Sequence, residues 1–385
     1  MILRIFLLLI FYTQAAIAIS QAVISNRQSG NLPANYYQSA NGLTCAQLKT
    51  ALSGIISAGY NELLYGELWA TYSRTDKRRN DANTADIVWD MYSDNPTGPD
   101  PYTYSFGINQ CGQYNKEGDC YNREHTFPQS WFTELTPMKS DMNHIFPTDG
   151  EVNGIRSNFP YGDVTNVSIT TRNGSRLGSG NNFGYTGTVF EPINEYKGDV
   201  ARAILYMAVR YESQIATWLN NGNANEVLNG TTYPVFDPWH IKLLYKWHLQ
   251  DPVSEKEIRR NDSVFVIQKN RNPFIDRPEW VYDIWSCTGL IVATSVTNDI
   301  SLKPDAIHIY PQPAKASGII SIECPTLNSP GYLEIVNFSG EIIHKQRVGM
   351  NERKISIQRI NFKPGLYFVK INKGLNTFVK KLIID

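Results

Sequence analysis

The chain has 385 residues, of which 42% are hydrophobic and 19% charged, and its 36 basic side chains balance 36 acidic ones. This length exceeds one small domain, and the composition excludes a disordered protein. Because the net charge is zero, the chain is no globally basic polymer-binding protein, and any nucleic-acid surface must be a local patch.

The first 18 residues have the pattern of a signal peptide. Arg4 precedes an apolar run over residues 5–12, and Ala16 and Ala18 form an A-x-A cleavage site. The run is shorter than the roughly 20 apolar residues that span a bilayer, and we expect no membrane span later in the chain. We therefore predict export, with cleavage after Ala18 and a polar tether over residues 19–42.

Export permits disulfide bonds among the five cysteines. Cys111 and Cys120 flank a short polar loop, which favours a local bridge. Cys45 and Cys287 would then tie together the ends of a large domain, and Cys324 is left over. The alternative, five buried thiols, fits an oxidising destination less well.

The first predicted elements surround the N-terminal part of the large domain. Thr44 is expected to cap a helix in which Leu48, Leu52 and Ile55 recur at helical spacing. Residues 87–93 are predicted to form a buried strand, and the Gly-rich residues 164–186 a long loop.

The strongest helical pattern covers residues 198–220, where one apolar stripe predicts a core helix. A second helix is predicted over residues 238–249, with His240 and His248 as packing or surface residues. A basic run follows, which is either a solvated face or a phosphate-binding patch. Its members are Lys256, Arg259, Arg260, Lys269, Arg271 and Arg277.

Beyond a predicted linker over residues 291–304, the pattern changes to short alternating stretches separated by Gly, Pro or Asn. Such a pattern predicts a small all-β sandwich over residues 305–385.

Two stretches, residues 121–131 and 140–158, concentrate polar side chains. Since Phe127 precedes Pro128, residues 122–127 are predicted to form a strand that carries Glu124 and His125 side by side.

In the second stretch, Thr148 and Glu151 form a T-x-x-E capping box, which predicts a helix starting at residues 147–148. Asn153 and Arg156 would share one face of this helix. Gly150 and Gly154 would let it approach a strand closely.

The residue types in these stretches favour hydrolysis of phosphodiesters. The Glu124 carboxylate and the Asn153 amide oxygen are hard ligands suited to Mg²⁺, or to Ca²⁺ or Mn²⁺. His125 is suited to act as a general base, since an ordinary histidine pKa of about 6.5 leaves it mostly neutral at pH 7. A zinc site of Glu124, His125 and His144 is the weaker alternative, because no H-x₃-H or C-x₂-C spacing supports it.

Neighbouring residues have milder interpretations. Asp141 and His144 are expected to make structural hydrogen bonds rather than bind the metal. Asp149 is expected at the helix N-terminus or at the metal. Arg123 is either a phosphate contact or a solvated strand residue. Glu191 and Asp199 are expected to anchor the long helix to the site region.

The motifs R-E-H-T-F-P-Q-S-W-F and S-D-M-N-H-I-F-P-T-D-G-E-V-N-G-I-R-S-N resemble the endonuclease I family, and further similarities extend over most of residues 40–287. The resemblance implies an α+β fold, with a mainly helical nuclease domain over residues 43–290 and a ββα-metal (His-Me finger) active site. It also implies Mg²⁺-dependent cleavage of DNA, and often RNA, with little sequence preference. By this resemblance His125 is the general base, Glu124 and Asn153 hold the metal, and Arg156 contacts the cleaved phosphate.

The C-terminal region resembles a type IX secretion C-terminal sorting domain through I-Y-P-Q-P at 309–313, P-G-L-Y-F-V at 364–369 and K-K-L-I-I at 380–384. This resemblance implies interaction with the type IX secretion machinery and a secreted or cell-surface location. The sequence therefore predicts a secreted, monomeric, Mg²⁺-dependent endonuclease acting on DNA and RNA. The alternative is a surface nucleic-acid-binding or adhesive protein without turnover, and the intact Glu124, His125 and Asn153 favour the enzyme.

Overall fold

The computed structural model describes residues 32–96, 98–291, 307–315, 318–324, 331–337, 342–349, 352–357, 362–373 and 376–385. They belong to two compact units, one within Ile24–Val292 and the other within Ala293–Asp385. The predicted signal peptide and residues 292–304 of the predicted linker lie outside the described residues. Tyr37 and Ala40, from the predicted tether, are buried in the core of the first unit.

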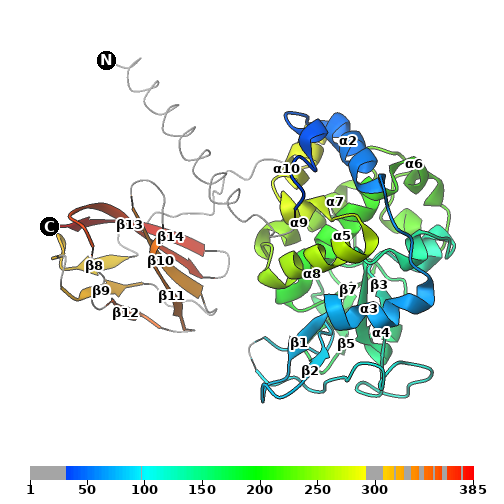
Figure 1. Ribbon diagram of the computed structural model, residues 1–385, viewed down its shortest axis with the longest axis horizontal. Helices are drawn as coiled ribbons and strands as arrows, with labels where there is room; N and C mark the ends of the chain where they lie inside the picture. Colours follow the sequence, from blue (N-terminus) through cyan, green and yellow to red (C-terminus); the bar gives the residue numbers. More distant parts are fainter. Residues whose placement is uncertain are drawn as a thin grey trace. The chain divides into compact units, whose positions relative to one another are not determined.

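The first unit is mainly helical, with short strands between the helices (Figure 1). Its α-helices are α2 (Cys45–Ser57), α3 (Leu68–Thr75), α4 (Gly150–Arg156), α5 (Lys197–Arg210), α6 (Glu212–Ile215), α7 (Pro238–Gln250), α8 (Glu255–Gln268), α9 (Pro273–Asp276) and α10 (Trp280–Trp285). Its strands are β1 (Lys77–Arg79), β2 (Asp86–Val88), β3 (Tyr121–His125), β4 (Ile145–Asp149), β5 (Asn166–Thr170), β6 (Arg176–Ser179) and β7 (Thr188–Glu191). They pair as β1-β2, β3-β4 and β5-β6-β7, all antiparallel. In the described part of the chain, no helix has the length and apolar character that crossing a bilayer requires.

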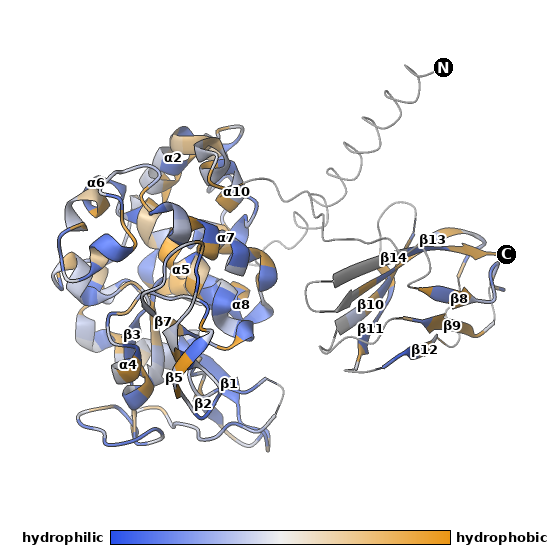
Figure 2. Ribbon diagram, turned by 180° about the vertical axis from the view of Figure 1, so that it is seen from behind, coloured by the Kyte–Doolittle hydropathy of each residue, from blue (hydrophilic) through white to orange (hydrophobic). Residues whose placement is uncertain are grey.

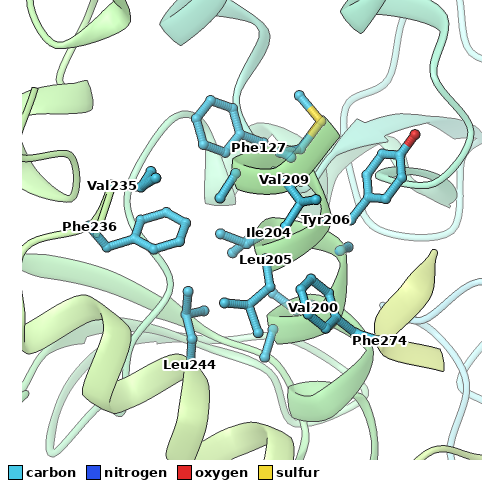
Figure 3. Close-up of a cluster of buried hydrophobic side chains, with 14 of the residues drawn as sticks. Phe127, Val200, Ile204, Leu205, Tyr206, Val209, Val235, Phe236, Leu244 and Phe274 are labelled. Atoms are coloured by element: carbon cyan, nitrogen blue, oxygen red, sulfur yellow. The ribbon is translucent and has the colours of Figure 1, made fainter. Parts of the chain in front are cut away.

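Helix α5 is the centre of this unit, and every one of its residues except Arg210 is buried. Figure 3 shows Val200, Ile204 and Leu205 of α5 facing Phe236 and Leu244 across the core. Their burial confirms the predicted apolar stripe. The helix is shorter than predicted, because the backbone leaves the helical conformation at Tyr211 (φ −109°, ψ 35°) before α6 begins.

Helix α8 contrasts with α5, since it is largely hydrophilic in Figure 2 yet partly buried. Its buried Glu257 and Arg260 pair with Arg202 and Asp76, at 2.5 and 2.7 Å. Charged side chains are compatible with this interior position because each has an opposite charge within hydrogen-bond distance.

Two predictions for the first unit are wrong in extent. The strand predicted over residues 87–93 ends at Val88, because the Asp90 carboxylate accepts the Tyr92 N–H at 2.7 Å and turns the chain. The loop predicted over residues 164–186 contains β5 and β6, which pair with each other, and β6 also pairs with β7. Val167 and Ile169 of β5 alternate with polar residues, but every residue of β5 is exposed, so this short alternation marks no buried face.

The second unit consists of two antiparallel sheets around one buried core, which confirms the predicted β-rich C-terminal domain. One sheet has the order β11-β10-β13-β14 and the other the order β12-β9-β8. The strands are β8 (His308–Tyr310), β9 (Ile320–Glu323), β10 (Gly331–Asn337), β11 (Ile342–Val348), β12 (Lys354–Ile357), β13 (Gly365–Lys373) and β14 (Asn376–Ile384).

Candidate active site

The two polar stretches come together as an antiparallel pair of strands followed at once by a helix. In the β3–β4 register, Glu124 lies opposite Phe146 and His125 opposite Ile145, and α4 begins directly after β4. The predicted strand over residues 122–127 is therefore confirmed, shifted slightly to Tyr121–His125.

The start of α4 differs from the prediction. Thr148 lies within β4, and the N-cap is Asp149, whose carboxylate accepts the Val152 N–H at 2.8 Å. The predicted capping box between Thr148 and Glu151 is therefore wrong. Pro147 fits the strand because β4 pairs with β3 alone, so a missing N–H interrupts no second ladder.

The glycines of α4 meet a loop instead of a strand. A Cβ atom at Gly150 would lie 2.5 Å from Cys111 Sγ, and one at Gly154 would lie 2.6 Å from the Tyr114 hydroxyl. Cys111 is bonded to Cys120, so the disulfide loop packs on this face of α4. The second predicted bridge, Cys45–Cys287, is also present, and the Cys324 thiol donates to the Glu352 carbonyl outside both bridges.

Glu124 is buried, and one of its two oxygens is firmly held. Its Oε1 accepts the hydroxyls of Tyr92 at 3.0 Å and Tyr161 at 2.9 Å, and lies 3.2 Å from Arg156 Nη1. Burial raises the pKa of the Glu124 carboxyl, while the Arg156 charge and the two tyrosine hydrogen bonds lower it. None of these three contacts involves the other carboxylate oxygen, Oε2.

His125, next to Glu124, has its tautomer fixed by the backbone. Its Nε2 lies 3.2 Å from the Lys139 carbonyl oxygen, which can only accept, so Nε2 carries the proton and Nδ1 has a free lone pair. Burial, and after it the neighbouring His144, lower the pKa of His125 to about 3. The ring is therefore neutral at pH 7, with its centroid 5.6 Å from that of His144.

Arg156 connects the end of α4 to the end of β3. Its Nη1 donates to the His125 carbonyl at 2.9 Å and its Nη2 to the Thr126 carbonyl at 2.8 Å. The side chain is buried, and its guanidinium carbon lies 4.4 Å from the centre of the Tyr161 ring. These bonds indicate that Arg156 positions the end of β3. They do not support the predicted contact between Arg156 and phosphate.

Asn153 lies on α4, half-buried, and in the described part of the chain no hydrogen bond involves its side-chain amide. His144 donates from Nε2 to the Met138 carbonyl at 2.7 Å, and Asp141 accepts from the hydroxyls of Tyr206 and Tyr211, each at 2.8 Å. These two residues have structural partners, as predicted. Among the described residues, no three His, Cys, Asp or Glu side chains gather as potential metal ligands.

Comparison with known proteins identifies the family to which the chain belongs. Residues 44–279, more than half of the chain, match the Endonuclease I family profile. The chain belongs to the endonuclease I family. Residues 308–385 match the secretion system C-terminal sorting domain.

Several relatives of this endonuclease I family member are known nucleases. The chain is 34% identical to an extracellular ribonuclease of Bacillus amyloliquefaciens over 255 residues, which are 65% of this chain and 78% of the relative. It is 33% identical to the extracellular ribonuclease of Bacillus subtilis (strain 168) over 257 residues, with the same two coverages. An extracellular deoxyribonuclease of Aeromonas hydrophila is 28% identical over 152 residues, or 37% of this chain and 52% of the relative.

Three residues of the basic run have acidic partners in the interior of this endonuclease I family member. Arg260 pairs with Asp76 at 2.7 Å, and Arg271 with Asp276 at 2.7 Å. Lys256 lies 3.4 Å from Asp199. The phosphate-binding interpretation of these three residues is therefore not supported. Asp199 links α5 to α8 rather than to the predicted site region.

Sequence reasoning missed the two tyrosines that hold Glu124. Tyr92 and Tyr161 lie 32 and 37 residues from Glu124 in the chain. No spacing rule connects such distant positions. The one sequence signal is that Tyr92 lies within residues 40–287, over which the chain resembles the endonuclease I family.

Proposed function

We propose that the chain is a secreted, sequence-non-specific endonuclease that hydrolyses phosphodiester bonds of DNA and RNA with one divalent cation and His125 as general base. The observation that carries the proposal is the fixed tautomer of His125, whose unprotonated Nδ1 belongs to the residue next to a buried, oriented Glu124. In this proposal β3, β4 and α4 form a ββα-metal (His-Me finger) site.

The side chains present fit a hard cation. Glu124 has one oxygen held by three groups and a second that these groups leave available, and Asn153 adds an amide oxygen. Oxygen ligands of this kind suit Mg²⁺, and also Ca²⁺ or Mn²⁺. When bound, the cation would neutralise charge that develops on the phosphate and on the leaving oxygen.

His125 would act on the attacking water. Nδ1 takes one proton from the water while the water oxygen forms a bond to phosphorus. The bond from phosphorus to the leaving oxygen then breaks, and the leaving oxygen takes a proton from solvent water, which leaves one strand end with a phosphate and the other with a hydroxyl. His125 returns its proton to solvent afterwards. The Lys139 carbonyl stabilises the imidazolium that results, because it keeps accepting from Nε2–H.

The C-terminal domain and the relatives support export. The sorting domain over residues 308–385 supports recognition by the type IX secretion machinery, and the three relatives described above are extracellular nucleases. We propose that residues 1–18 are a signal peptide, that residues 43–290 are the monomeric catalyst, and that residues 305–385 direct it to the cell surface or the medium.

Incubation of the purified protein with plasmid DNA and with RNA tests the proposal. Mg²⁺ should support degradation of both, and EDTA should stop it. A protein that binds these polymers but leaves them intact with Mg²⁺, Mn²⁺ or Ca²⁺ would instead be the non-catalytic surface protein.

A further inference from the structure

Arg123 and His125 lie two residues apart on β3, and residues with this spacing project to the same face of a strand. Tyr65, in a short 3₁₀ helix before α3, contacts both side chains. Its ring centre lies 3.6 Å from the guanidinium carbon of Arg123 and 5.9 Å from the ring centre of His125. The guanidinium carbon also lies 4.4 Å from the Trp69 ring centre. A planar cation is thus held beside the proposed base.

The charge of Arg123 has no carboxylate partner among the described residues, in contrast to Arg260 and Arg271. Its Nη1 donates to the Tyr65 carbonyl at 3.0 Å, while its Nε is buried and no described group accepts from it. A guanidinium has five N–H donors and binds phosphate with two at once. The remaining Nη hydrogens of Arg123 have no described acceptor and are therefore available to a ligand.

Lys139 adds a second cation to the same surface. Its carbonyl accepts from His125, and its ammonium lies 5.2 Å from the Tyr65 ring centre. The ammonium pairs with Glu134 at 2.6 Å, but the Glu134 side chain is 54% exposed. Exposed pairs contribute little to stability, so Lys139 is able to exchange this carboxylate for a phosphate.

We infer that Arg123, Tyr65 and Lys139 form the surface that holds the substrate strand beside His125, with Arg123 bound to a backbone phosphate next to the scissile one. The inference rests on the proposed nuclease function. The aromatic rings fix the guanidinium before the substrate arrives, which lowers the entropy lost on binding. A phosphate contact carries no base information, so this surface accepts any sequence.

The test measures binding without turnover. The His125→Ala protein is added in increasing amounts to a fluorescent single-stranded DNA oligonucleotide, and the fluorescence anisotropy of the oligonucleotide gives the binding constant K. The titration is repeated at several salt concentrations. Each phosphate contact contributes about 0.7 to the slope of log K against log salt for a single strand. Arg123→Gln in this background should weaken binding several-fold and reduce the slope by about 0.7. Arg123→Lys should keep the slope.

Arg172→Gln is the matched control. Arg172 also lies over a tyrosine, with its guanidinium carbon 5.0 Å from the Tyr102 ring centre, and it also donates to a backbone carbonyl, that of Pro101, at 3.0 Å. Its loss should leave affinity and slope unchanged. Equal changes for Arg172→Gln and Arg123→Gln, or a full slope for Arg123→Gln, would overturn the inference.

Glu134→Gln gives an independent arm if Arg123→Gln fails to fold. It releases Lys139 from its carboxylate and should strengthen binding, and unchanged affinity would overturn the shared role of Lys139. Failure of the proposed nuclease function is seen separately, as intact plasmid after incubation of the unmutated protein with Mg²⁺.

Discussion

The imidazole of His125 is held by the backbone carbonyl of Lys139, 14 residues away, at 3.2 Å from Nε2. This bond decides which nitrogen is basic, and it couples the proposed base to the chain segment that leads into β4.

Replacement of His125 by Ala removes the proposed base and should reduce the rate of plasmid cleavage at least 100-fold, as expected for loss of general-base catalysis. Added imidazole should restore part of the rate, since it can occupy the space of the missing ring. The unfolding midpoint, followed by tryptophan fluorescence, reports whether the fold survives. Cleavage by the variant at the original rate would disprove the assignment of His125.

The hydroxyls of Tyr92 and Tyr161 orient the Glu124 carboxylate, so Tyr92→Phe and Tyr161→Phe should weaken metal binding. We expect the Mg²⁺ concentration for half-maximal cleavage to rise about 10- to 100-fold, the usual effect of losing a group that orients a ligand. The maximal rate at saturating Mg²⁺ should change far less.

Tyr185→Phe is the control for these variants, because the Tyr185 hydroxyl also donates to a carboxylate, Glu226, at 2.7 Å, away from the site. Its Mg²⁺ requirement should match that of the unmutated protein. If the Tyr92 and Tyr161 variants behave like this control, Glu124 does not hold the cation.

Replacement of Arg156 distinguishes a structural role, in which it holds Glu124 and β3, from a contact with the cleaved phosphate. Arg156→Met leaves the buried Glu124 charge unpaired and deprives the His125 and Thr126 carbonyls of their donors. Breaking a buried pair in this way costs about 3–5 kcal/mol of unfolding free energy. Urea unfolding followed by tryptophan fluorescence measures the loss. Unchanged stability together with lost cleavage would instead favour the contact with phosphate that the family resemblance implied.

Local signals in the sequence were sufficient for the strand that carries Glu124 and His125 and for helix α7, because proline position and apolar spacing act over a few residues. The start of α4 was misplaced because two neighbouring residues, Thr148 and Asp149, are both good caps. Tertiary contacts decide between them: the Asp149 N–H donates to Asp90 at 2.9 Å, and its carboxylate accepts from Gly118 at 2.8 Å.

The basic run was harder to interpret for the same reason. Arg260 and its partner Asp76 are separated by 184 residues, and nothing local distinguishes an arginine with such a partner from one on a solvated face. Arg123 is the opposite case. Its sequence neighbourhood allows either a phosphate contact or a solvated strand residue, and only its contacts with the Tyr65 and Trp69 rings favour the phosphate contact.

Acid should destabilise the first unit through its buried histidines. Burial alone lowers the pKa of His240 to about 3, and its ring nitrogens have no hydrogen-bond partner among the described residues. The ordinary value is about 6.5, so below that pH the unfolded chain binds a proton that the folded chain does not. Stability is therefore full above about pH 6.5 and falls as pH drops, by about 1.4 kcal/mol per pH unit for each such histidine.

His240→Phe should remove the contribution of one histidine to this pH dependence, and it keeps an aromatic ring between the rings of Phe236 and Trp239, which His240 now contacts. Urea unfolding at several pH values between 7 and 4 measures the slopes. Equal slopes for the variant and the unmutated protein would show that His240 is protonated in the folded state.

Finally, a chain that ends at residue 292 should fold and cleave like the whole protein. The first unit has its own core, and both disulfides close within it. All 8 tryptophans lie before residue 292, so fluorescence reports this unit alone. A chain that ends at residue 286 is the control: it loses Cys287, the partner of Cys45, and should be less stable by about 2–5 kcal/mol. Lost cleavage in the longer truncation would mean that the sorting domain contributes to the catalyst as well as to export.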